Sequence, residues 1–325
     1  MRAIIQTQFG APEVLQISEL PIPQTNAEQL LIKVFATALN RADLLQRKGL
    51  YPPPPNESEI LGLEIAGEVA ACGEQVTNFK KGDRIFGLVG SGGYAEYCAI
   101  DAKMAMPIPS NLSFTEAAAI PEAFLTANEA LFNLANLQKG QTILIHAGGS
   151  GVGSAAIQLA KVSQALVYTT AGSDQKLAKL AELGAIGINY KNNDFVQSTL
   201  QLTEGRGVDT IIDFIGANYF CRNLQLLKPT GCMVLVGMLS GSKTTVDLWE
   251  IISKRLQLKG LVMRSQSLAE KRIITQKFAN TWLSYFANKI IQPVIDIIFP
   301  LNKIQEAHRY MEANKNFGKI VIDCS

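Results

Sequence analysis

The sequence predicts an α/β protein that combines a β-rich domain with a doubly wound parallel sheet. Three observations lead to this fold class. Short apolar runs separated by Gly, Pro and Asn fill residues 1–120, and apolar runs alternate with helical stretches over 142–263. A glycine-rich segment at 144–161 joins an apolar strand to a helix. The length of 325 residues fits two domains.

The first part of the chain has the spacing of a compact β domain with Greek-key or barrel character. Strands are predicted at 3–8, 30–39, 64–73, 83–90 and 94–100. The run "YPPPP" at 51–55 cannot form a helix or a central strand, because proline has a fixed φ and no N–H donor. We therefore expect an extended, stiff surface loop there.

The middle of the chain predicts six strands that alternate with helices, which is typical of a parallel, doubly wound sheet. The strands are expected at 142–147, 165–171, 186–190, 208–216, 232–237 and 256–263. Helices are expected at 154–164, at 174–184, where Gly184 closes the helix, and over a stretch that ends near Glu204.

The tail predicts one long helix at about 268–288 and two further strands, at 294–300 and 318–324. These strands could return to the first domain. The expected organisation is therefore a catalytic domain in two parts, residues 1–122 and 264–325, with a dinucleotide-binding domain at 123–263 inserted between them.

The segment "HAGGSGVGS" predicts a phosphate-binding loop, because it follows a strand and opens a helix. Gly148 and Gly153 suit a tight turn and close helix packing, and Gly151 lets backbone N–H groups approach a diphosphate. Ser150 stands where the usual pattern has glycine, and its small side chain adds a hydroxyl. A tight turn that binds no ligand is the alternative.

The residues after the second strand of this sheet favour NADPH over NADH. NAD sites usually have Asp or Glu there, whereas this chain has Ala171 and Gly172. Ser173 and Lys176 could accept a 2′-phosphate, and Tyr190 could reach the same group. Asp174 could be a displaced ribose ligand, but we favour a role for it in the first turn of the next helix, with Ser173 as the cap.

Composition excludes several classes of partner and site. The net charge of +2 without charged blocks gives no support for nucleic acid or a membrane surface. No leader or apolar span is visible, and the five cysteines lack paired spacing, so we expect a cytoplasmic protein with reduced thiols. His146 is expected to be structural and His308 to lie on a helix surface. Neither has metal-ligand spacing, so no metal is expected.

No nucleophile motif is present either, which leaves direct hydride transfer by a bound cofactor. Several motifs together resemble those of one known family. They are "ALNRADLLQRKGLY" (38–51), "LGLEIAGEV" (61–69), "KKGDRIFGL" (80–88), "AAAIPEAFLTANEAL" (117–131), the glycine loop, "NYK" (189–191) and "EAHRYMEANKNFGKIVID" (306–323).

Over its whole length the chain resembles the zinc-independent, zeta-crystallin-like quinone oxidoreductases of the medium-chain dehydrogenase/reductase superfamily. It is most similar to the branch known in animals as tumour-suppressor-inducible NADPH quinone oxidoreductases. The resemblance implies a GroES-like catalytic domain, a Rossmann domain and a homodimer or homotetramer. Zinc-dependent members have a ligand cysteine where this chain has "NRAD", and Gly-His-Glu where it has Gly62-Leu63-Glu64. Of the structural-zinc cysteines, only Cys98 is present.

The resemblance also implies roles for individual residues. Tyr51 would line the acceptor pocket and Ser150 would lie near the reactive site; both are expected to be catalytic, as donors of hydrogen bonds to the developing quinol oxygen. The cofactor would be held by Asn40, Thr126, Ser150, Gly151, Val152, Gly172, Ser173, Lys176, Tyr190, Gly216, Gly237, Met238, Met263 and Arg264. Simpler structural roles remain open for several of these residues. Asn40 could cap a turn, Tyr51 could pack on the prolines, and Lys176 could be a solvated helix lysine. Gly216 and Gly237 could only form turns, and Arg264 could lie at a subunit contact.

These observations predict an NADPH-dependent quinone reductase that reduces a small-molecule quinone, without a metal, in the cleft between the domains. One alternative is an enoyl-thioester reductase, which would need a basic path for a large carrier, with Arg41, Arg47 and Lys48 as candidates. Another is a low-turnover NADPH-binding sensor or RNA-binding protein, which the near-neutral charge hardly supports.

Overall fold

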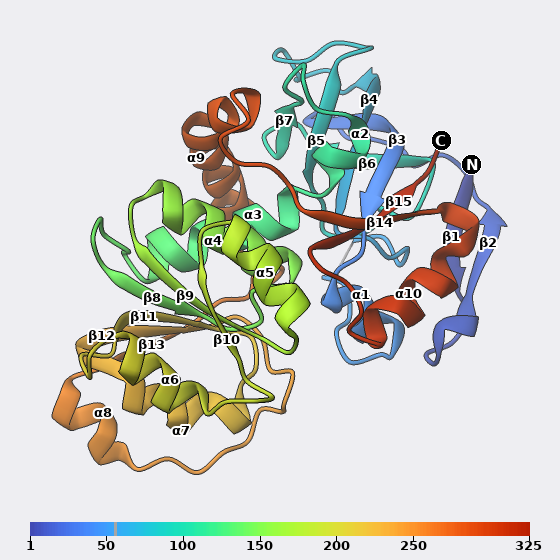
Figure 1. The fold of residues 1–325 in the computed structure, drawn as a ribbon. Coiled ribbons are helices and arrows are strands. Elements are labelled where there is room, and N and C mark those ends of the chain that lie inside the picture. The colour runs from blue at the N-terminus through green and yellow to red at the C-terminus, as the bar shows by residue number, and fades with distance from the viewer. Residues whose placement is uncertain (55–56) are drawn as a thin grey trace. The chain divides into compact units, whose positions relative to one another are not determined.

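A computed structural model of the chain describes residues 1–54 and 57–325, and these form two compact units (Figure 1). Unit 1 contains Met1–Leu125 and Met263–Ser325, and unit 2 contains Thr126–Val262. The first boundary falls inside helix α3 (Pro121–Asn128), which continues into a π-helical turn at Glu129–Leu134. In the described part of the chain, no helix combines the length and apolarity needed to cross a bilayer.

Unit 1 is built on a seven-stranded sheet in the order β14-β15-β3-β4-β5-β7, with β6 paired to β3. The five predicted strands are all confirmed, as β1 and β3 to β6, whereas the short β2 and β7 and the helices α1 and α2 were not predicted. The bounds are β1 Arg2–Gln6, β2 Leu15–Glu19, β3 Gln29–Ala38, α1 Arg41–Arg47, β4 Glu64–Cys72, β5 Arg84–Leu88, β6 Tyr97–Asp101, β7 Ala105–Pro107 and α2 Phe114–Ala118.

The C-terminal segment belongs to the same sheet. Strand β15 (Lys319–Asp323) runs antiparallel to β3, and β14 (Ile295–Pro300) runs parallel to β15. The predicted long helix is α9 (Leu268–Ala287), and α10 (Ile304–Glu312) precedes β15. Between residues 51 and 54 the chain has neither helix nor strand, as proline predicts; Pro55, the last residue of "YPPPP", lies outside the described residues.

Unit 2 is a six-stranded sheet whose neighbouring strands are all parallel, in the order β10-β9-β8-β11-β12-β13. This is the doubly wound arrangement, and all six predicted strands are confirmed. The bounds are β8 Thr142–Ile145, β9 Leu166–Ala171, β10 Ile186–Asn189, β11 Val208–Asp213, β12 Leu227–Leu235 and β13 Gln257–Gly260.

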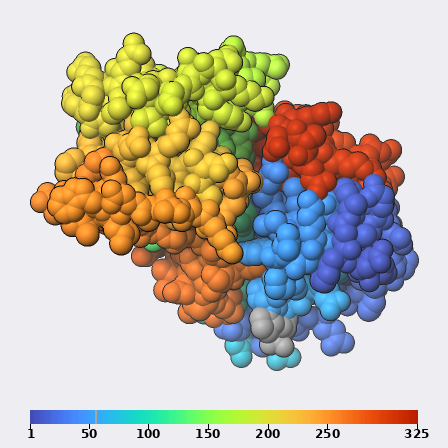
Figure 2. All heavy atoms as spheres, turned by 90° about the horizontal axis from the view of Figure 1, so that it is seen from below, coloured from blue at the N-terminus to red at the C-terminus, as the bar shows by residue number. Residues whose placement is uncertain are grey.

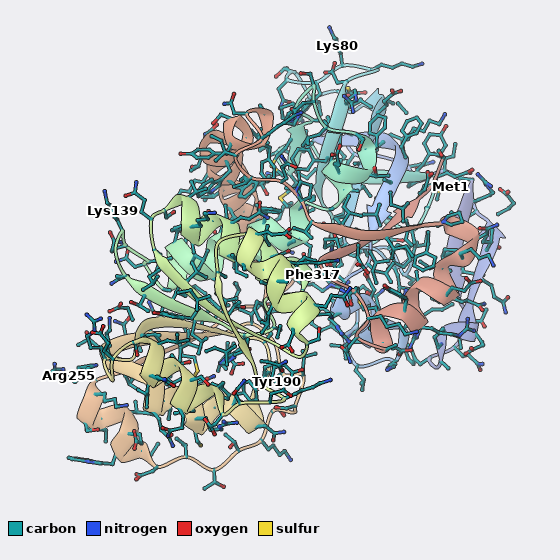
Figure 3. The ribbon with its side chains drawn as sticks, in the orientation of Figure 1. Met1, Lys80, Lys139, Tyr190, Arg255 and Phe317 are labelled. Atoms are coloured by element: carbon teal, nitrogen blue, oxygen red, sulfur yellow. The ribbon has the colours of Figure 1, made fainter. Side chains whose placement is uncertain are left out.

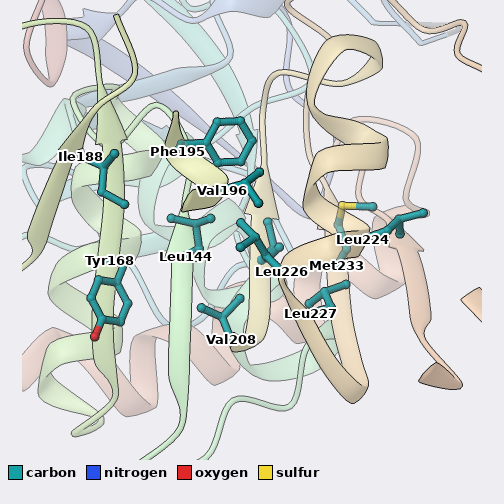
Figure 4. Close-up of a cluster of buried hydrophobic side chains, with 11 residues drawn as sticks. Leu144, Tyr168, Ile188, Phe195, Val196, Val208, Leu224, Leu226, Leu227 and Met233 are labelled. Carbon is teal, nitrogen blue, oxygen red and sulfur yellow. The ribbon is translucent and has the colours of Figure 1, made fainter. Parts of the chain in front are cut away.

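Helices cover both faces of this sheet, with α4 and α5 on one side and α6 and α7 on the other (Figure 1). Apolar side chains of α6 and α7 pack against β8, β11 and β12 in one buried cluster (Figure 4). Helix α8 contributes no buried residue and lies on the surface of unit 2, in the orange segment of Figure 2. The bounds are α4 Gly151–Val162, α5 Asp174–Glu182, α6 Phe195–Leu202, α7 Ala217–Leu226 and α8 Leu248–Lys254.

Both histidines are buried, so the prediction that His308 lies on a helix surface is wrong. His308 lies on the inner side of α10, with Nδ1 3.1 Å from Nη1 of Arg47 and Nε2 3.5 Å from the Tyr94 hydroxyl. Burial, and next the Arg47 charge, lower its pKa to about 3. His146 bridges Thr170 and Asn223 inside unit 2, as expected for a structural residue.

We expect His308 to make stability fall in acid. An unfolded chain takes up a proton near pH 6.5, and the folded chain takes it up only near pH 3, so stability is lost as the pH falls through this window. The slope amounts to about 1.4 kcal/mol per pH unit. This slope is measured from urea unfolding midpoints between pH 7 and pH 4. In a Trp249→Phe background, the fluorescence of the buried Trp282 follows the unfolding of unit 1.

His308→Asn should flatten the dependence of the unit 1 midpoint on pH. His146→Asn, in unit 2, is the matched control. An unchanged slope in His308→Asn would contradict the neutral, buried state of this histidine.

Candidate functional site

The glycine-rich loop connects β8 to α4, and two of its glycines are required by close contacts. A Cβ on Gly148 would lie 2.0 Å from Thr169 Oγ1, and a Cβ on Gly153 would lie 2.4 Å from the carbonyl oxygen of Ala147. Neither position therefore accepts a side chain without a shift of its neighbours. Strand β9 and helix α4 approach each other closely at this loop, as a dinucleotide-binding turn requires.

Ser150 is the N-cap of α4. Its Oγ accepts a hydrogen bond from the backbone N–H of Gly153 at 3.0 Å, and its own hydroxyl proton has no acceptor among the described residues. Within the same part of the chain, the N–H groups of Gly151 and Val152 also lack an acceptor. Free donors at the start of a twelve-residue helix fit a bound diphosphate.

A second group of expected cofactor residues lies where β9 and β10 end. A Cβ on Gly172 would meet the Tyr190 hydroxyl at 2.7 Å and Cε of Lys191 at 3.3 Å, so both side chains lie against Gly172. Ser173 caps α5 by accepting the N–H of Lys176 at 3.3 Å. The structure thus brings these expected 2′-phosphate residues together. Lys191 was not predicted, although it belongs to the "NYK" motif.

Asp174 is the first residue of α5, which confirms the interpretation of Ser173 and Asp174 as cap and first turn. Its Oδ1 accepts a hydrogen bond from Asn189 Nδ2 at 2.6 Å. The carboxylate is therefore anchored to β10. Ala171, at the end of β9, is buried and offers no acidic group for a ribose.

The loops after β11 and β12 interlock at the same edge of the sheet. Gly216 has φ +85°, and its N–H donates to Asp213 Oδ1 at 3.2 Å. A Cβ on Gly216 would lie 3.0 Å from Cα of Met238, and one on Gly237 would lie 3.0 Å from the carbonyl oxygen of Phe214. Gly216, Gly237 and Met238 are thus neighbours at the carboxyl ends of parallel strands, where such sheets bind ligands. The glycines also suit their role as turn formers.

Thr126 stands at the start of unit 2, on α3. It is buried, and its Oγ1 has no hydrogen-bond partner in the described part of the chain. A buried hydroxyl without a partner is unfavourable by about 1–3 kcal/mol. A ligand that hydrogen-bonds to this hydroxyl would remove that cost, so Thr126 fits a contact with a cofactor.

In unit 1, Asn40 is the N-cap residue of α1 and forms a capping box with Asp43, whose Oδ2 accepts the Asn40 N–H at 2.8 Å. Its Nδ2 donates to Glu64 Oε1 at 2.7 Å, and its Oδ1 accepts from Lys319 Nζ at 2.7 Å. Lys319 Nζ also donates to Glu64 Oε1 at 2.7 Å and to the carbonyl oxygen of Leu39 at 2.9 Å. Two buried, oppositely charged side chains therefore fix the orientation of the Asn40 carboxamide.

Glu64 and Lys319 were not predicted as part of a site. The signal available in the sequence was a charged residue next to apolar residues in each of two strands, Glu64 in "LGLEIAGEV" and Lys319 in "GKIVIDC". No group of three or more His, Cys, Asp and Glu side chains within residues 1–54 and 57–325 is arranged to hold a metal ion.

Tyr51 packs against Arg264, whose guanidinium lies 4.6 Å from the centre of the tyrosine ring. Arg264 also donates to the carbonyl oxygens of Tyr51 at 3.1 Å and Gly90 at 3.3 Å, and to Gln46 Oε1 at 2.7 Å. Burial raises the pKa of the tyrosine hydroxyl, which therefore stays protonated. Arg264 thus anchors Tyr51, which precedes the first proline of the run, and the residue before Arg264, Met263, is buried.

Two family descriptions match the chain. Residues 26–110 match the alcohol dehydrogenase GroES-like domain, and residues 151–277 match the zinc-binding dehydrogenase family. The quinone oxidoreductase of Lama guanicoe is 32% identical, over 99% of this chain and 97% of that protein.

Solved structures resemble the whole chain. Quinone oxidoreductase from Escherichia coli, in complex with NADPH, is 30% identical with a TM-score of 0.90 and covers 100% of both chains. The CurK enoyl reductase is 28% identical with a TM-score of 0.88, covering 99% of this chain and 98% of that one. Both GroES-like and Rossmann-type sheets are therefore shared with known oxidoreductases.

The capping role of Ser150 predicts a difference between two substitutions. Ser150→Ala removes the acceptor for the Gly153 N–H and should lower the free energy of unfolding of unit 2 by about 1 kcal/mol, whereas Ser150→Gly should lower it by only a few tenths. Urea unfolding followed by Trp249 fluorescence in a Trp282→Phe background measures this difference. Equal losses in the two variants would contradict the cap.

Proposed function

Because the chain belongs to the quinone oxidoreductase family of the medium-chain dehydrogenase/reductases, we propose that it is an NADPH-dependent reductase of small quinones that works without a metal. The observation that supports this most directly is the set of free N–H donors at the start of α4, combined with the Gly172, Tyr190 and Lys191 group at the next strand ends. Together they match the diphosphate and the 2′-phosphate of one dinucleotide.

NADPH is favoured over NADH by charge. The Asp174 carboxylate is held by Asn189, while Lys191 supplies positive charge beside Gly172 and Lys176 follows in the first turn of α5. A 2′-phosphate is stabilised by such cations and would be repelled by an acidic residue in the place of Ala171. We assign Gly172, Ser173, Lys176 and Tyr190 to the 2′-phosphate, and Ser150, Gly151 and Val152 to the diphosphate.

When bound, NADPH would supply the hydride. The protein's own groups would orient the nicotinamide and the quinone: Asn40, locked by Glu64 and Lys319, on the nicotinamide side, and Tyr51, held by Arg264, beside the acceptor. The Tyr51 and Ser150 hydroxyls could donate hydrogen bonds to an oxygen that gains negative charge. We assign Thr126, Gly216, Gly237 and Met238 to further cofactor contacts.

Metal-free chemistry is supported by the surroundings of Glu64. Lys319 Nζ, 2.7 Å from Glu64 Oε1, already neutralises this carboxylate, and the neighbouring position 63 is leucine. A divalent cation at this place would face the ammonium group of Lys319.

An enoyl-thioester reductase is the second candidate, because the CurK enoyl reductase is similar over nearly the whole chain. The basic path for a large carrier is not supported. Arg47 is fully buried and bound to Glu312 at 2.6 Å, and Lys48 Nζ lies 2.8 Å from the same carboxylate. Of the three candidate residues, Arg47 is therefore buried, and Lys48 is exposed but paired with Glu312 of the same unit.

We also propose that the protein forms a homodimer. Strand β13 is at the edge of its sheet, and the neighbouring α8 exposes Leu248, Trp249 and Ile252. An edge strand beside exposed apolar side chains is a surface that a second copy could cover.

For the cofactor, Lys176→Ala should weaken NADPH binding at least tenfold and leave NADH binding within about twofold, because only NADPH has the charge that the lysine binds. Lys139→Ala is the matched control: Lys139 is an exposed lysine that precedes β8, at the opposite ends of the strands from Tyr190 (Figure 3).

Two measurements provide the test. Fluorescence titration measures the binding of both cofactors, and steady-state rates are measured with ortho- and para-quinones and with 2-enoyl thioesters. Equal effects on NADPH and NADH would contradict the 2′-phosphate assignment, and turnover of thioesters alone would contradict the quinone assignment.

A further inference from the structure

Asp213 is the last residue of β11, and its side chain holds the loop that follows this strand. Its Oδ1 accepts hydrogen bonds from the backbone N–H groups of Ile215 at 2.7 Å and Gly216 at 3.2 Å. Gly216 has φ +85° and ψ −129°, a backbone conformation that favours glycine. The buried carboxylate therefore fastens a turn that glycine makes possible.

The main chain of Asp213 also holds the second loop at this edge of the sheet. Its carbonyl oxygen accepts the N–H groups of Val236 at 2.8 Å and Gly237 at 3.3 Å, directly after β12. The carbonyl oxygen of Ile215, in the first loop, accepts the N–H of Ser240 in the second at 2.8 Å. Asp213 is thus the residue at which the loops after β11 and β12 are tied together.

A series of buried side chains orients the Asp213 carboxylate. Asn223 on α7 donates from Nδ2 to Asp213 Oδ2 at 3.2 Å, and its Oδ1 lies 2.8 Å from His146 Nε2. His146, which directly follows β8, places its Nδ1 3.0 Å from the hydroxyl of Thr170 on β9. All four side chains are buried. We call Thr170, His146, Asn223 and Asp213 the polar relay.

The hydrogen bonds of the polar relay all run in one direction. An amide oxygen only accepts, so His146 Nε2 carries the proton that Asn223 Oδ1 accepts. Burial lowers the pKa of His146 to about 4, so the ring is neutral at pH 7 and Nδ1 accepts from the Thr170 hydroxyl. Each donor of the relay therefore faces an acceptor, and the Asp213 carboxylate is the final acceptor.

The two loops tied by Asp213 lie on one side of the glycine-rich loop. In the strand order β10-β9-β8-β11-β12-β13, the group assigned to the 2′-phosphate lies at the ends of β9 and β10. The loop assigned to the diphosphate follows β8. A dinucleotide that meets both groups continues past β8 to the ends of β11 and β12. Its nicotinamide half is therefore expected at the loops that Asp213 holds.

We propose that Asp213 is a positioning residue for the nicotinamide half of NADPH, which acts through the loops of Gly216 and Gly237 and is itself oriented by Asn223 and His146. The inference rests on the proposed binding of NADPH. Neither glycine has a side chain to offer, so the place of the backbone determines this side of the site. The 2′-phosphate group is held by other strands, so loss of the carboxylate should loosen one half of the site only.

Binding of the whole cofactor and of one half separates positioning from general loosening. In Asp213→Asn, whichever way the new amide lies, its N–H groups face another donor, either Asn223 Nδ2 or the Ile215 N–H. Titration calorimetry at pH 8 keeps Asp213 of the unmodified protein ionised, because burial raises its pKa only to about 6. NADPH should bind at least about tenfold more weakly to the variant. Adenosine 2′,5′-bisphosphate, which lacks the nicotinamide half, should bind within about twofold of the unmodified protein.

The matched control is Asp209→Asn, at the opposite end of the same strand. Asp209 Oδ2 accepts the Thr142 N–H and pairs with Lys228 Nζ, both at 2.8 Å. This substitution also removes a hydrogen-bonded carboxylate from β11, but away from the two loops. It should leave the affinities for NADPH and for the bisphosphate unchanged.

An exchange of two side chains tests the polar relay itself. Asn223→Asp alone sets two carboxylates against each other and should weaken NADPH binding as strongly as Asp213→Asn does. In the double variant Asp213→Asn/Asn223→Asp an amide again donates to a carboxylate, which still accepts from His146. The affinity for NADPH should return to within about threefold of the unmodified protein.

The state of His146 gives a check that needs no substitution in the relay. In ¹⁵N NMR spectra of histidine-labelled protein, assigned with His308→Asn, His146 should carry its proton on Nε2; a proton on Nδ1 would overturn the relay. Equal losses of NADPH and bisphosphate affinity in Asp213→Asn, or a double variant no better than the single ones, would overturn the positioning role and leave NADPH binding standing. An unmodified protein that does not bind NADPH would overturn both.

Discussion

The ion pair between Glu64 and Lys319 is the interaction on which the arrangement of unit 1 depends. It joins two residues 255 positions apart, and both side chains are removed from water. A buried ion pair overcomes its desolvation cost only when its hydrogen-bonding groups are satisfied. Here Lys319 has three donors and three acceptors: Leu39, Asn40 and Glu64. The pair therefore fastens the returning strand β15 to β4 and at the same time fixes the Asn40 carboxamide.

A chain of buried polar contacts extends from this pair toward α10. Asp43 accepts the Tyr94 hydroxyl, Tyr94 lies near His308, and His308 lies near Arg47, whose guanidinium also reaches Glu312. Each group buried in this series has a partner, as a low-dielectric interior requires. Helix α10 is consequently part of the interior of unit 1, although it is encoded about 260 residues after α1.

The sequence predicted the elements of the fold well because their causes are local. Apolar periodicity and glycine position placed all six strands of unit 2, and strand ends placed Gly172 and Tyr190 at one edge. Gly216 was assigned through the family resemblance. Long-range partners could not be predicted in this way. His308 stands among charged residues in "IQEAHRYME", which indicates a surface, and only the distant Arg47 and Tyr94 make it an interior residue. The same holds for Glu64, whose partner Lys319 lies in another apolar run.

The departure from the glycine pattern at position 150 has a geometric explanation. Side chains at 148 and 153 would collide with Thr169 and with the Ala147 carbonyl, so glycine is required at both positions. Ser150, in contrast, has φ −80° and ψ 167°, an extended conformation open to any residue. Its Oγ satisfies the Gly153 N–H, while the N–H groups of Gly151 and Val152 stay available. Of positions 148, 150 and 153, the loop therefore accepts a side chain only at 150. There the serine adds a helix cap and leaves the expected phosphate donors free.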